Sequence, residues 1–123
     1  MILGSNMEGY YQPVRGLQYY YITKGHGKQD VIFLHGFLGS HAIFLEGLLE
    51  TDLVDTHRLI LMDLLGHGAT EGAELHYRFS AKEQVADLAY FIRHHCQKPV
   101  ILCGYSMGAR LALSLAIQHL SLI

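Results

Sequence analysis

VILCGYSMGAR, residues 100–110, decides the fold of this chain. Val100–Cys103 is a short apolar run typical of a buried strand, and the residues from Met107 onward have helical spacing. Between them lies Ser106, with a glycine two residues away on each side, which is the G-x-S-x-G pattern of a nucleophile elbow. The glycines leave room for a tight turn, and the start of the helix directs free N–H groups toward the serine oxygen. Ser106 is therefore a candidate nucleophile or base.

The rest of the chain alternates between apolar runs and segments with helical spacing. We predict strands at 16–23, 31–34, 59–62 and 100–103, and helices at 43–49, 80–95 and 107–119. The first two strands are separated by a glycine-containing turn and predict a hairpin. Residues 1–15 are expected to form a loose leader, and residues 16–123 the N-terminal part of one domain. This order predicts the α/β class: a three-layer sandwich with a mostly parallel sheet covered by helices on both faces.

The helix expected from residue 80 has the clearest boundaries. Ser80 and Glu83 have the spacing of a capping box, and a single apolar stripe follows, formed by Val85, Leu88, Ala89 and Ile92. We expect His94 and His95 to lie at its exposed end, and the residues between 69 and 79 to form a loop.

Composition indicates one globular domain and argues against several classes of partner. Apolar residues make up 50% of the 123 residues and charged residues 16%, as in chains that fold around a core. A formal net charge of −2 provides no general attraction to nucleic acid or to an acidic membrane. The sequence has neither a run of 18 apolar residues nor the pattern of a secretory signal, so we expect no membrane association and a cytoplasmic location.

The two cysteines do not suggest a metal site. Cys96 and Cys103 lack the paired spacing of zinc ligands, and we predict no metal and no cofactor. Since Cys103 falls in a strand expected to be central, we expect reduced, buried thiols.

Two other predicted strands end in glycine-containing polar segments. His35-Gly36-Phe37 follows the strand at 31–34, and the segment from Asp63 to Gly68 follows the strand at 59–62. In open α/β sheets such strand ends meet at one edge, where ligands bind. This agreement favours a functional Ser106 over the alternative in which that serine only caps its helix.

These segments resemble the α/β-hydrolase superfamily from about residue 17 to the end of the chain. More narrowly, HGFLGS at 35–40 and GYSMGARLAL at 104–113 resemble the synthases of menaquinone biosynthesis that eliminate pyruvate from their substrate. The resemblance implies an oxyanion hole formed by the backbone N–H groups of Phe37 and Met107. It also implies that Ser106, activated by a histidine, removes a proton in those synthases, whereas in hydrolases the same serine attacks an ester carbonyl.

Further roles follow from the same resemblance. Arg110 lies one helical turn after Ser106 and is expected, with Tyr105, to bind the substrate, the guanidinium holding a carboxylate. The alternative for Arg110 is a solvated surface side chain. Four loop residues are expected to be structural: His35, Gly36, Asp63 and His67. For Asp63 the alternative is the acid of a catalytic triad, which the usual chain order disfavours.

The superfamily places an acid and a histidine after the serine, and this chain has only His119 there. Thirteen residues of helix would separate His119 from Ser106 by roughly 20 Å, too far for proton transfer. The strands that usually follow in the superfamily are also absent, which would leave residues 100–103 as a bare apolar edge. We therefore expect a partial α/β-hydrolase fold, a fragment or truncated product that is inactive alone and self-associates through that edge.

Three functions are consistent with these observations. The first is part of a carbon–oxygen lyase of menaquinone biosynthesis that eliminates pyruvate from a small carboxylate substrate. The second is part of a serine carboxylic-ester hydrolase, and the third is an inactive remnant that acts only by binding a protein.

Overall fold

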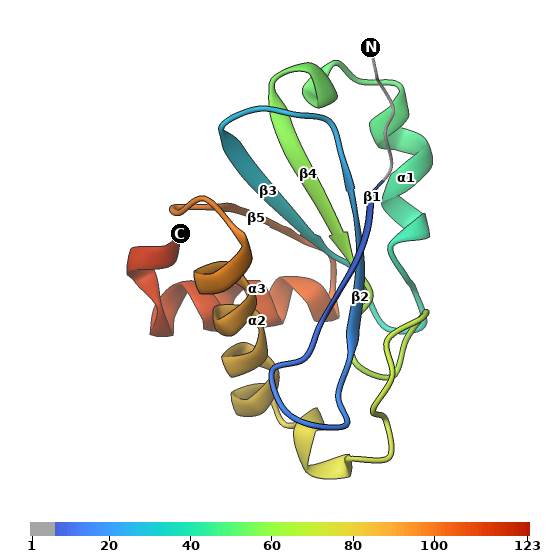
Figure 1. Cartoon of the computed structure of the whole chain (residues 1–123), viewed down its shortest axis with the longest axis vertical. Helices are drawn as coiled ribbons and strands as arrows, with labels where there is room; N and C mark the ends of the chain where they lie inside the picture. Colours follow the sequence, from blue (N-terminus) through green and yellow to red (C-terminus); the bar gives the residue numbers. More distant parts are fainter. Residues whose placement is uncertain (1–6) are drawn as a thin grey trace.

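A computed structural model describes residues 7–123 (Figure 1). The strands are β1 (Met7–Tyr11), β2 (Tyr19–Lys24), β3 (Gln29–Leu34), β4 (His57–Met62) and β5 (Ile101–Gly104). The α-helices are α1 (Ala42–Leu49), α2 (Ala81–His95) and α3 (Met107–Gln118), and the 3₁₀ helices are η1 (Leu53–Asp55), η2 (His76–Phe79) and η3 (Leu120–Leu122). Each predicted strand and helix is present, with boundaries shifted by at most a few residues.

The strands form one mixed sheet in the order β1-β2-β4-β3-β5. β3 pairs in parallel with both β4 and β5, whereas β2 is antiparallel to β1 and β4. Among these strands only β2 therefore runs against the common direction, which confirms the mostly parallel sheet. The carboxyl ends of β4, β3 and β5 lie side by side and bring three loops together.

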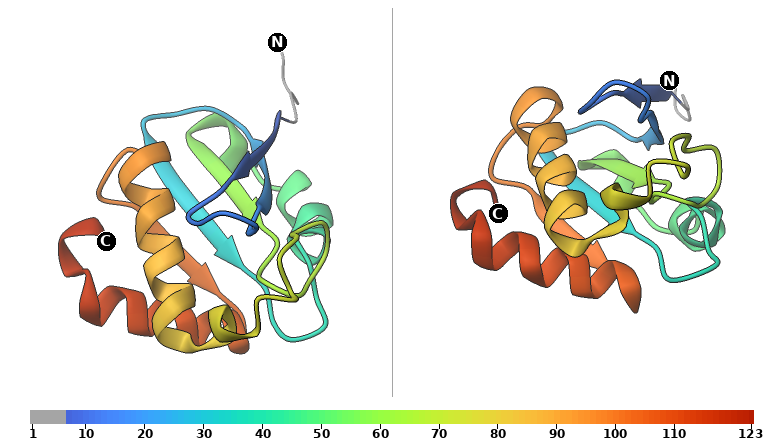
Figure 2. Two further views of the ribbon diagram at one scale, coloured as in Figure 1. Left: turned by 60° about the horizontal axis from the view of Figure 1, so that its bottom comes forward. Right: turned by 90° about the horizontal axis from the view of Figure 1, so that it is seen from below.

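Helices cover both faces of the sheet, as Figure 2 shows. Side chains that alternate along the strands divide into two apolar clusters. One packs under α2 and α3 and includes Ile32, Leu34, Ile60 and Met62. The other packs under α1 and includes Val31, Phe33, Leu59 and Leu61. The three-layer α/β prediction is confirmed. No helix among residues 7–123 has the length and apolar character needed to cross a membrane.

α2 begins as its sequence predicts. The Ser80 hydroxyl accepts the Glu83 N–H at 3.2 Å, and the predicted apolar stripe is buried. The Glu83 carboxylate, however, accepts a bond from Arg78 at 2.7 Å, so the capping box is only half formed. Arg78, which lies in η2 within the predicted loop, also pairs with the buried Asp87, and Tyr19 donates to the same carboxylate at 2.9 Å. The apolar pattern gave no sign of this buried polar network.

Two expectations for the N-terminal part were wrong. Residues 7–11, expected in a loose leader, form the edge strand β1, because their tyrosines pack against β2 and α2: the Tyr11 ring stacks 4.9 Å from Tyr19 and lies 4.7 Å from Phe91. Residues 1–6 of the predicted leader lie outside the described residues. β2 and β3 do not form a hairpin, since β4 inserts between them, and the hairpin is formed by β1 and β2 instead.

β5 lies at the other edge of the sheet, where β3 is its partner among the described strands. Ile101 is 46% exposed and Cys103 is exposed, whereas Cys96 is half-buried. The expectation of a buried Cys103 is therefore wrong, because its strand is an edge strand rather than a central one. An edge of this kind offers unpaired N–H and C=O groups to another strand.

We expect this edge to cause concentration-dependent self-association, which Ile101→Lys should weaken, because a lysine at an edge strand opposes strand addition. The matched control is Ile43→Lys, since Ile43 is 50% exposed on α1, away from β5. Light scattering during size-exclusion chromatography measures the mass of each variant. A wild-type chain that stays monomeric as its concentration rises contradicts this expectation.

Candidate active site

Ser106 stands on a strained turn between β5 and α3. Its φ of 52° and ψ of −112° are rare for a residue with a side chain. The serine side chain makes no capping hydrogen bond to α3, which excludes the alternative of a simple helix cap. It is exposed, and its hydroxyl has no hydrogen-bond partner among residues 7–123. Strain of about 1–3 kcal/mol at such a residue is typical of functional sites.

Close backbone packing holds this elbow in place. A Cβ added to Gly108 would lie 2.1 Å from the Leu34 carbonyl oxygen, and one added to Gly104 would lie 2.6 Å from the Ala109 Cα. The Tyr105 N–H donates to the Leu34 carbonyl at 2.9 Å. The start of α3 is thus pressed against the end of β3, which brings Ser106 to the loop that follows β3.

That loop forms a tight turn beside the serine. The Gly39 N–H donates to the Gly36 carbonyl at 3.0 Å, and Leu38, between them, has a φ of 67°. A Cβ on Gly36 would lie 3.2 Å from the Ser106 Cβ, so the turn touches the elbow. Neither predicted oxyanion donor, the N–H of Phe37 or of Met107, has an acceptor within residues 7–123. Two unpaired donors flanking an exposed serine are the arrangement that stabilises an oxyanion.

His35 connects the loop after β3 to the loop after β4. It is completely buried; its Nδ1 lies 2.7 Å from the Gly36 carbonyl oxygen, and its Nε2 accepts the Leu64 N–H at 3.0 Å. The ring therefore carries its proton on Nδ1 and is neutral. Burial lowers the pKa of His35, against the opposing effect of the bond to Gly36. Because the Gly36 carbonyl and the Phe37 N–H belong to one peptide plane, His35 also orients the Phe37 donor.

His67 braces the two loops from the opposite side. Its Nδ1 lies 3.0 Å from the Leu65 carbonyl oxygen, and its Nε2 accepts the Leu38 N–H at 3.0 Å. His67 thus connects the loop after β4 to the turn at residues 36–39, a contact that the sequence did not reveal. The Phe37 ring packs edge-on at 5.8 Å from the ring of His67.

Asp63 stabilises its own loop and is fully buried. Its Oδ1 accepts bonds from the backbone N–H and the Nδ1 of His41, at 2.7 and 2.9 Å, and its Oδ2 accepts the Ala69 N–H at 2.9 Å. The Thr70 hydroxyl donates to its carbonyl. The described contacts of Asp63 thus connect residues 41, 69 and 70 to the end of β4. Sequence reasoning missed His41, because an isolated histidine in a loop carries no periodic signal.

The surface around Ser106 is apolar and open. Phe37 is 71% exposed, Leu38 82% and Tyr105 64%. Arg110 is exposed one turn along α3 and pairs with no carboxylate within the described residues. Tyr105 directly precedes the serine, and Phe37 follows the glycine that contacts it. An exposed arginine one helical turn along is suited to a substrate that carries a carboxylate.

No histidine among residues 7–123 bonds to the Ser106 hydroxyl. His119 ends α3, and its Nδ1 lies 3.1 Å from Arg93 on α2, a full helix length from Ser106. His35, His41 and His67 are all engaged in loop contacts. Nor do residues 7–123 bring together three histidine, cysteine or carboxylate side chains that could hold a metal ion. The described residues therefore present an exposed serine and two unpaired N–H groups, with no base bonded to Ser106.

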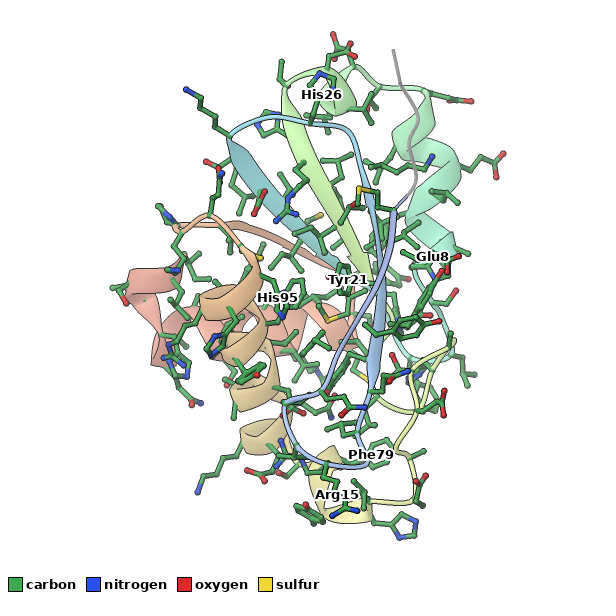
Figure 3. All side chains as sticks on the ribbon, viewed as in Figure 1. Glu8, Arg15, Tyr21, His26, Phe79 and His95 are labelled. Carbon is green, nitrogen blue, oxygen red and sulfur yellow. The ribbon has the colours of Figure 1, made fainter. Side chains whose placement is uncertain are left out.

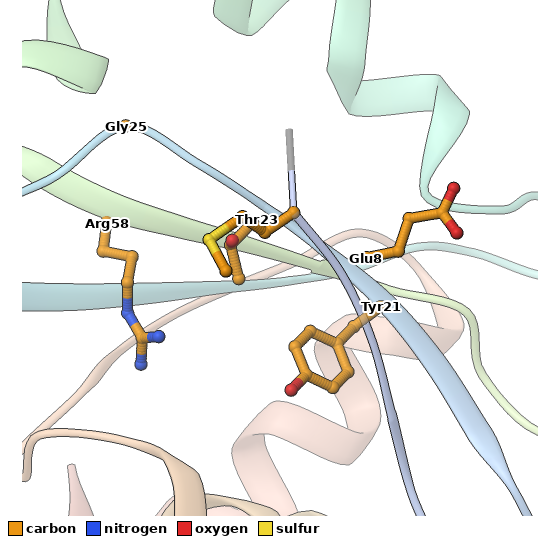
Figure 4. Close-up of a pocket in the computed structure, with 6 residues that line it drawn as sticks. Glu8, Tyr21, Thr23, Gly25 and Arg58 are labelled. Atoms are coloured by element: carbon orange, nitrogen blue, oxygen red, sulfur yellow. The ribbon is translucent and has the colours of Figure 1, made fainter. Parts of the chain in front are cut away.

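A cavity of about 160 Å³ lies away from this edge, between β1, β2 and the start of β4. Its lining residues are Met7, Glu8, Tyr21, Thr23, Gly25 and Arg58 (Figure 4). Arg58 is bound by Asp30 at 2.8 and 2.9 Å and is not free for a ligand. The Glu8 carboxylate points away from Arg58. In Figure 3 Phe79 marks the end of the molecule where the loop after β4 lies, and His26 marks the opposite end. The cavity contains none of the predicted site residues.

Residues 31–123 match the family model of the alpha/beta hydrolase fold. The chain belongs to this family. Over 105 residues it is 39% identical to a Bacillus subtilis (strain 168) protein named provisionally as a 2-succinyl-6-hydroxy-2,4-cyclohexadiene-1-carboxylate synthase, covering 85% of this chain and 37% of that protein. It is 33% identical over 110 residues to the Arabidopsis thaliana protein BODYGUARD 3, named provisionally as a lysophospholipase, covering 78% of this chain and 20% of that protein.

Solved structures of the family share this arrangement. A thioesterase domain from the curacin biosynthetic pathway superposes with a TM-score of 0.84 at 25% sequence identity. The match covers 98% of this chain and 42% of that domain. The chain thus spans less than half the length of each of these relatives, and it corresponds to the part of the fold that carries the elbow.

The packing at the elbow predicts opposite effects for two glycine-to-alanine changes. Gly108→Ala should lower the free energy of unfolding by roughly 3 kcal/mol or more, because the new methyl group meets the Leu34 carbonyl. Gly47→Ala, in the interior of α1 with open space around the site, should raise it by about 0.4–1 kcal/mol. Urea unfolding measures both, and a Gly108→Ala variant as stable as the wild type would contradict the proposed backbone contact.

The lowered pKa of His35 predicts that the folded protein loses stability in acid. Its pKa is lowered in the folded state, so as pH falls below about 6.5 the unfolded chain takes up a proton that the folded chain does not. Stability is therefore lost on acidification, by at most about 1.4 kcal/mol per pH unit from this group. Urea unfolding near pH 7.5 and near pH 5.5 should show a smaller loss for His35→Gln than for the wild type. Equal losses would show that His35 does not contribute.

Proposed function

We propose that this chain provides the serine and the oxyanion hole of a carbon–oxygen lyase that eliminates pyruvate to form 2-succinyl-6-hydroxy-2,4-cyclohexadiene-1-carboxylate. The proposal rests on one observation: an exposed serine on a strained elbow, flanked by two unpaired N–H groups. The similarity to the Bacillus subtilis protein of that name supports this reaction over others of the family.

In the proposed reaction Ser106 acts as a base. Its oxygen takes a proton from a substrate carbon, the electron pair of that C–H bond forms a C=C bond, and a C–O bond breaks to release pyruvate. Negative charge develops on an oxygen during this step, and the N–H groups of Phe37 and Met107 stabilise it. Each preorganised donor of this kind contributes about 3–4 kcal/mol to transition-state stabilisation. A histidine outside residues 7–123 would activate the serine.

Arg110 and Tyr105 would bind the substrate. The guanidinium lies one helical turn from the serine and has no ion-pair partner in the described part of the chain, so it is free to bind a carboxylate in a two-pronged contact. Tyr105 offers an exposed ring next to the oxyanion turn.

A serine carboxylic-ester hydrolase is the second candidate. The same elbow would then attack an ester carbonyl, and Ser106 would carry an acyl group until water releases it. The similarity to BODYGUARD 3 and to the curacin thioesterase domain favours this alternative.

Assays of the protein, expressed from its own gene and purified, distinguish the two candidate functions. We expect release of pyruvate from the synthase substrate, measured with a coupled dehydrogenase, and little hydrolysis of simple aryl esters. Ser106→Ala should lower kcat/KM by roughly 10³-fold or more. Serine-dependent ester hydrolysis without pyruvate release would instead support the hydrolase. Inactivity in both assays of a protein that carries the activating histidine together with Ser106 would contradict both.

Arg110→Ala tests the carboxylate contact. We expect KM for the carboxylate substrate to rise by about 10- to 100-fold, as for the loss of a charge-assisted bond, with partial recovery in Arg110→Lys. Arg93→Ala is the matched control, because Arg93 is exposed at the far end of α2. Wild-type efficiency in Arg110→Ala would show that Arg110 is only a solvated surface residue.

A further inference from the structure

Histidines hold two consecutive peptide groups of the oxyanion turn. The Gly36–Phe37 peptide accepts His35 Nδ1–H at its carbonyl, and the Phe37–Leu38 peptide donates its N–H to His67 Nε2. The proposed oxyanion donor, the Phe37 N–H, lies between these two contacts. No other side chain in the described part of the chain bonds to these two peptides.

Each of the two histidines connects the loop after β3 to the loop after β4. Each ring donates from Nδ1 to a carbonyl of its own loop and accepts at Nε2 an N–H from the other loop. Their ring centroids lie 5.0 Å apart. Both acceptor contacts require a neutral ring, because an imidazolium has no acceptor nitrogen.

The contact from His67 acts on a turn with two possible forms. A turn closed by the Gly39 N–H and the Gly36 carbonyl, with positive φ at Leu38, is of type II, in which glycine or asparagine is usual at that place. A type I turn would keep the closing bond and would relieve the positive φ of Leu38. The two forms differ by a flip of the Phe37–Leu38 peptide, which exchanges the Leu38 N–H with the Phe37 carbonyl.

Neutral and protonated His67 therefore favour different turns. Neutral Nε2 accepts the Leu38 N–H and stabilises the type II turn. A protonated Nε2–H would instead repel that N–H and donate to the Phe37 carbonyl of a flipped, type I turn. We propose that His67 is a positioning residue whose protonation state selects the form of the turn that carries the oxyanion donor Phe37 N–H.

The surroundings of His67 contain few other charges. His35 faces it from the end of β3, and the hydrogen-bonded pair of Asp63 and His41 lies at the same edge of the sheet. η2 contributes the uncharged ring of Phe79, which packs against Gly66. Any response to pH at this edge therefore has to be assigned to His67 by substitution.

Nuclear magnetic resonance of the isotope-labelled protein tests the assignment without any substrate. In a type II turn the Phe37 Hα lies close to the Leu38 N–H and gives a strong NOE, which weakens after the flip. We expect this NOE to be strong where the ring signals of His67 in the same sample show a neutral imidazole and weak where they show an imidazolium. His67→Gln keeps an acceptor that does not titrate and should retain the NOE over the same pH range. His67→Leu has no acceptor and should lose the NOE throughout that range, with Leu38 amide exchange about tenfold faster.

The Leu64 N–H, bound by His35, is an internal control that should respond to pH alike in the wild type and in His67→Gln. A strong NOE in His67→Leu, or the wild-type pH response in His67→Gln, would overturn the proposal. His67→Gln also shows whether the substituted loop still folds.

The catalytic consequence rests on the proposed function. In whichever reaction Ser106 serves, His67→Leu should lower kcat roughly 10- to 100-fold with KM changed by less than about threefold, and His67→Gln should restore it. The expected NOE pattern in a protein without activity would leave the positioning role intact and would reject the proposed reaction. Serine-dependent activity with an unchanged NOE in His67→Leu would reject the positioning role of His67 and leave the proposed reaction intact.

Discussion

The contact between Gly108 and the Leu34 carbonyl is the constraint on which the rest of the site depends. Only a hydrogen atom fits between the start of α3 and the end of β3. This approach fixes where the helix begins, forces Ser106 into a strained conformation and sets the serine against the turn at residues 36–39. Core packing of α3 against α2 and the sheet maintains the contact, since Leu111 and Leu115 are buried in the same cluster as Ile32 and Leu34.

Buried or half-buried polar side chains near this contact hold loops together. His35, Asp63 and His67 each bond to backbone groups of a different segment, so the loops after β3 and β4 hold one another. Satisfied hydrogen bonds of this kind offset the cost of burying a polar side chain. Ser106 and Arg110, in contrast, lack such contacts within residues 7–123, which leaves them available to a substrate.

The sequence was most informative where local chemistry determines structure. The elbow, the Ser80 cap and the apolar stripe of α2 follow from patterns within a few residues, and each was predicted correctly. Strand order was less accessible, because the insertion of β4 between β2 and β3 depends on packing over long separations. The same is true of pairs such as His41 with Asp63 and Tyr19 with Asp87, in which neither partner has a periodic signal.

The pairing of β3 with β5 has a consequence for how the site comes into being. Val31 pairs with Ile101 on the neighbouring strand, and the two residues are 70 positions apart in the sequence (101 minus 31). Closing so long a segment has an entropic cost that grows with the logarithm of its length, and parallel pairing at long range slows folding. The elbow has no partner for Gly108 until β3 is already in place. The strained geometry of Ser106 is therefore not a local property of the elbow: it depends on a strand that lies some 70 residues earlier in the sequence.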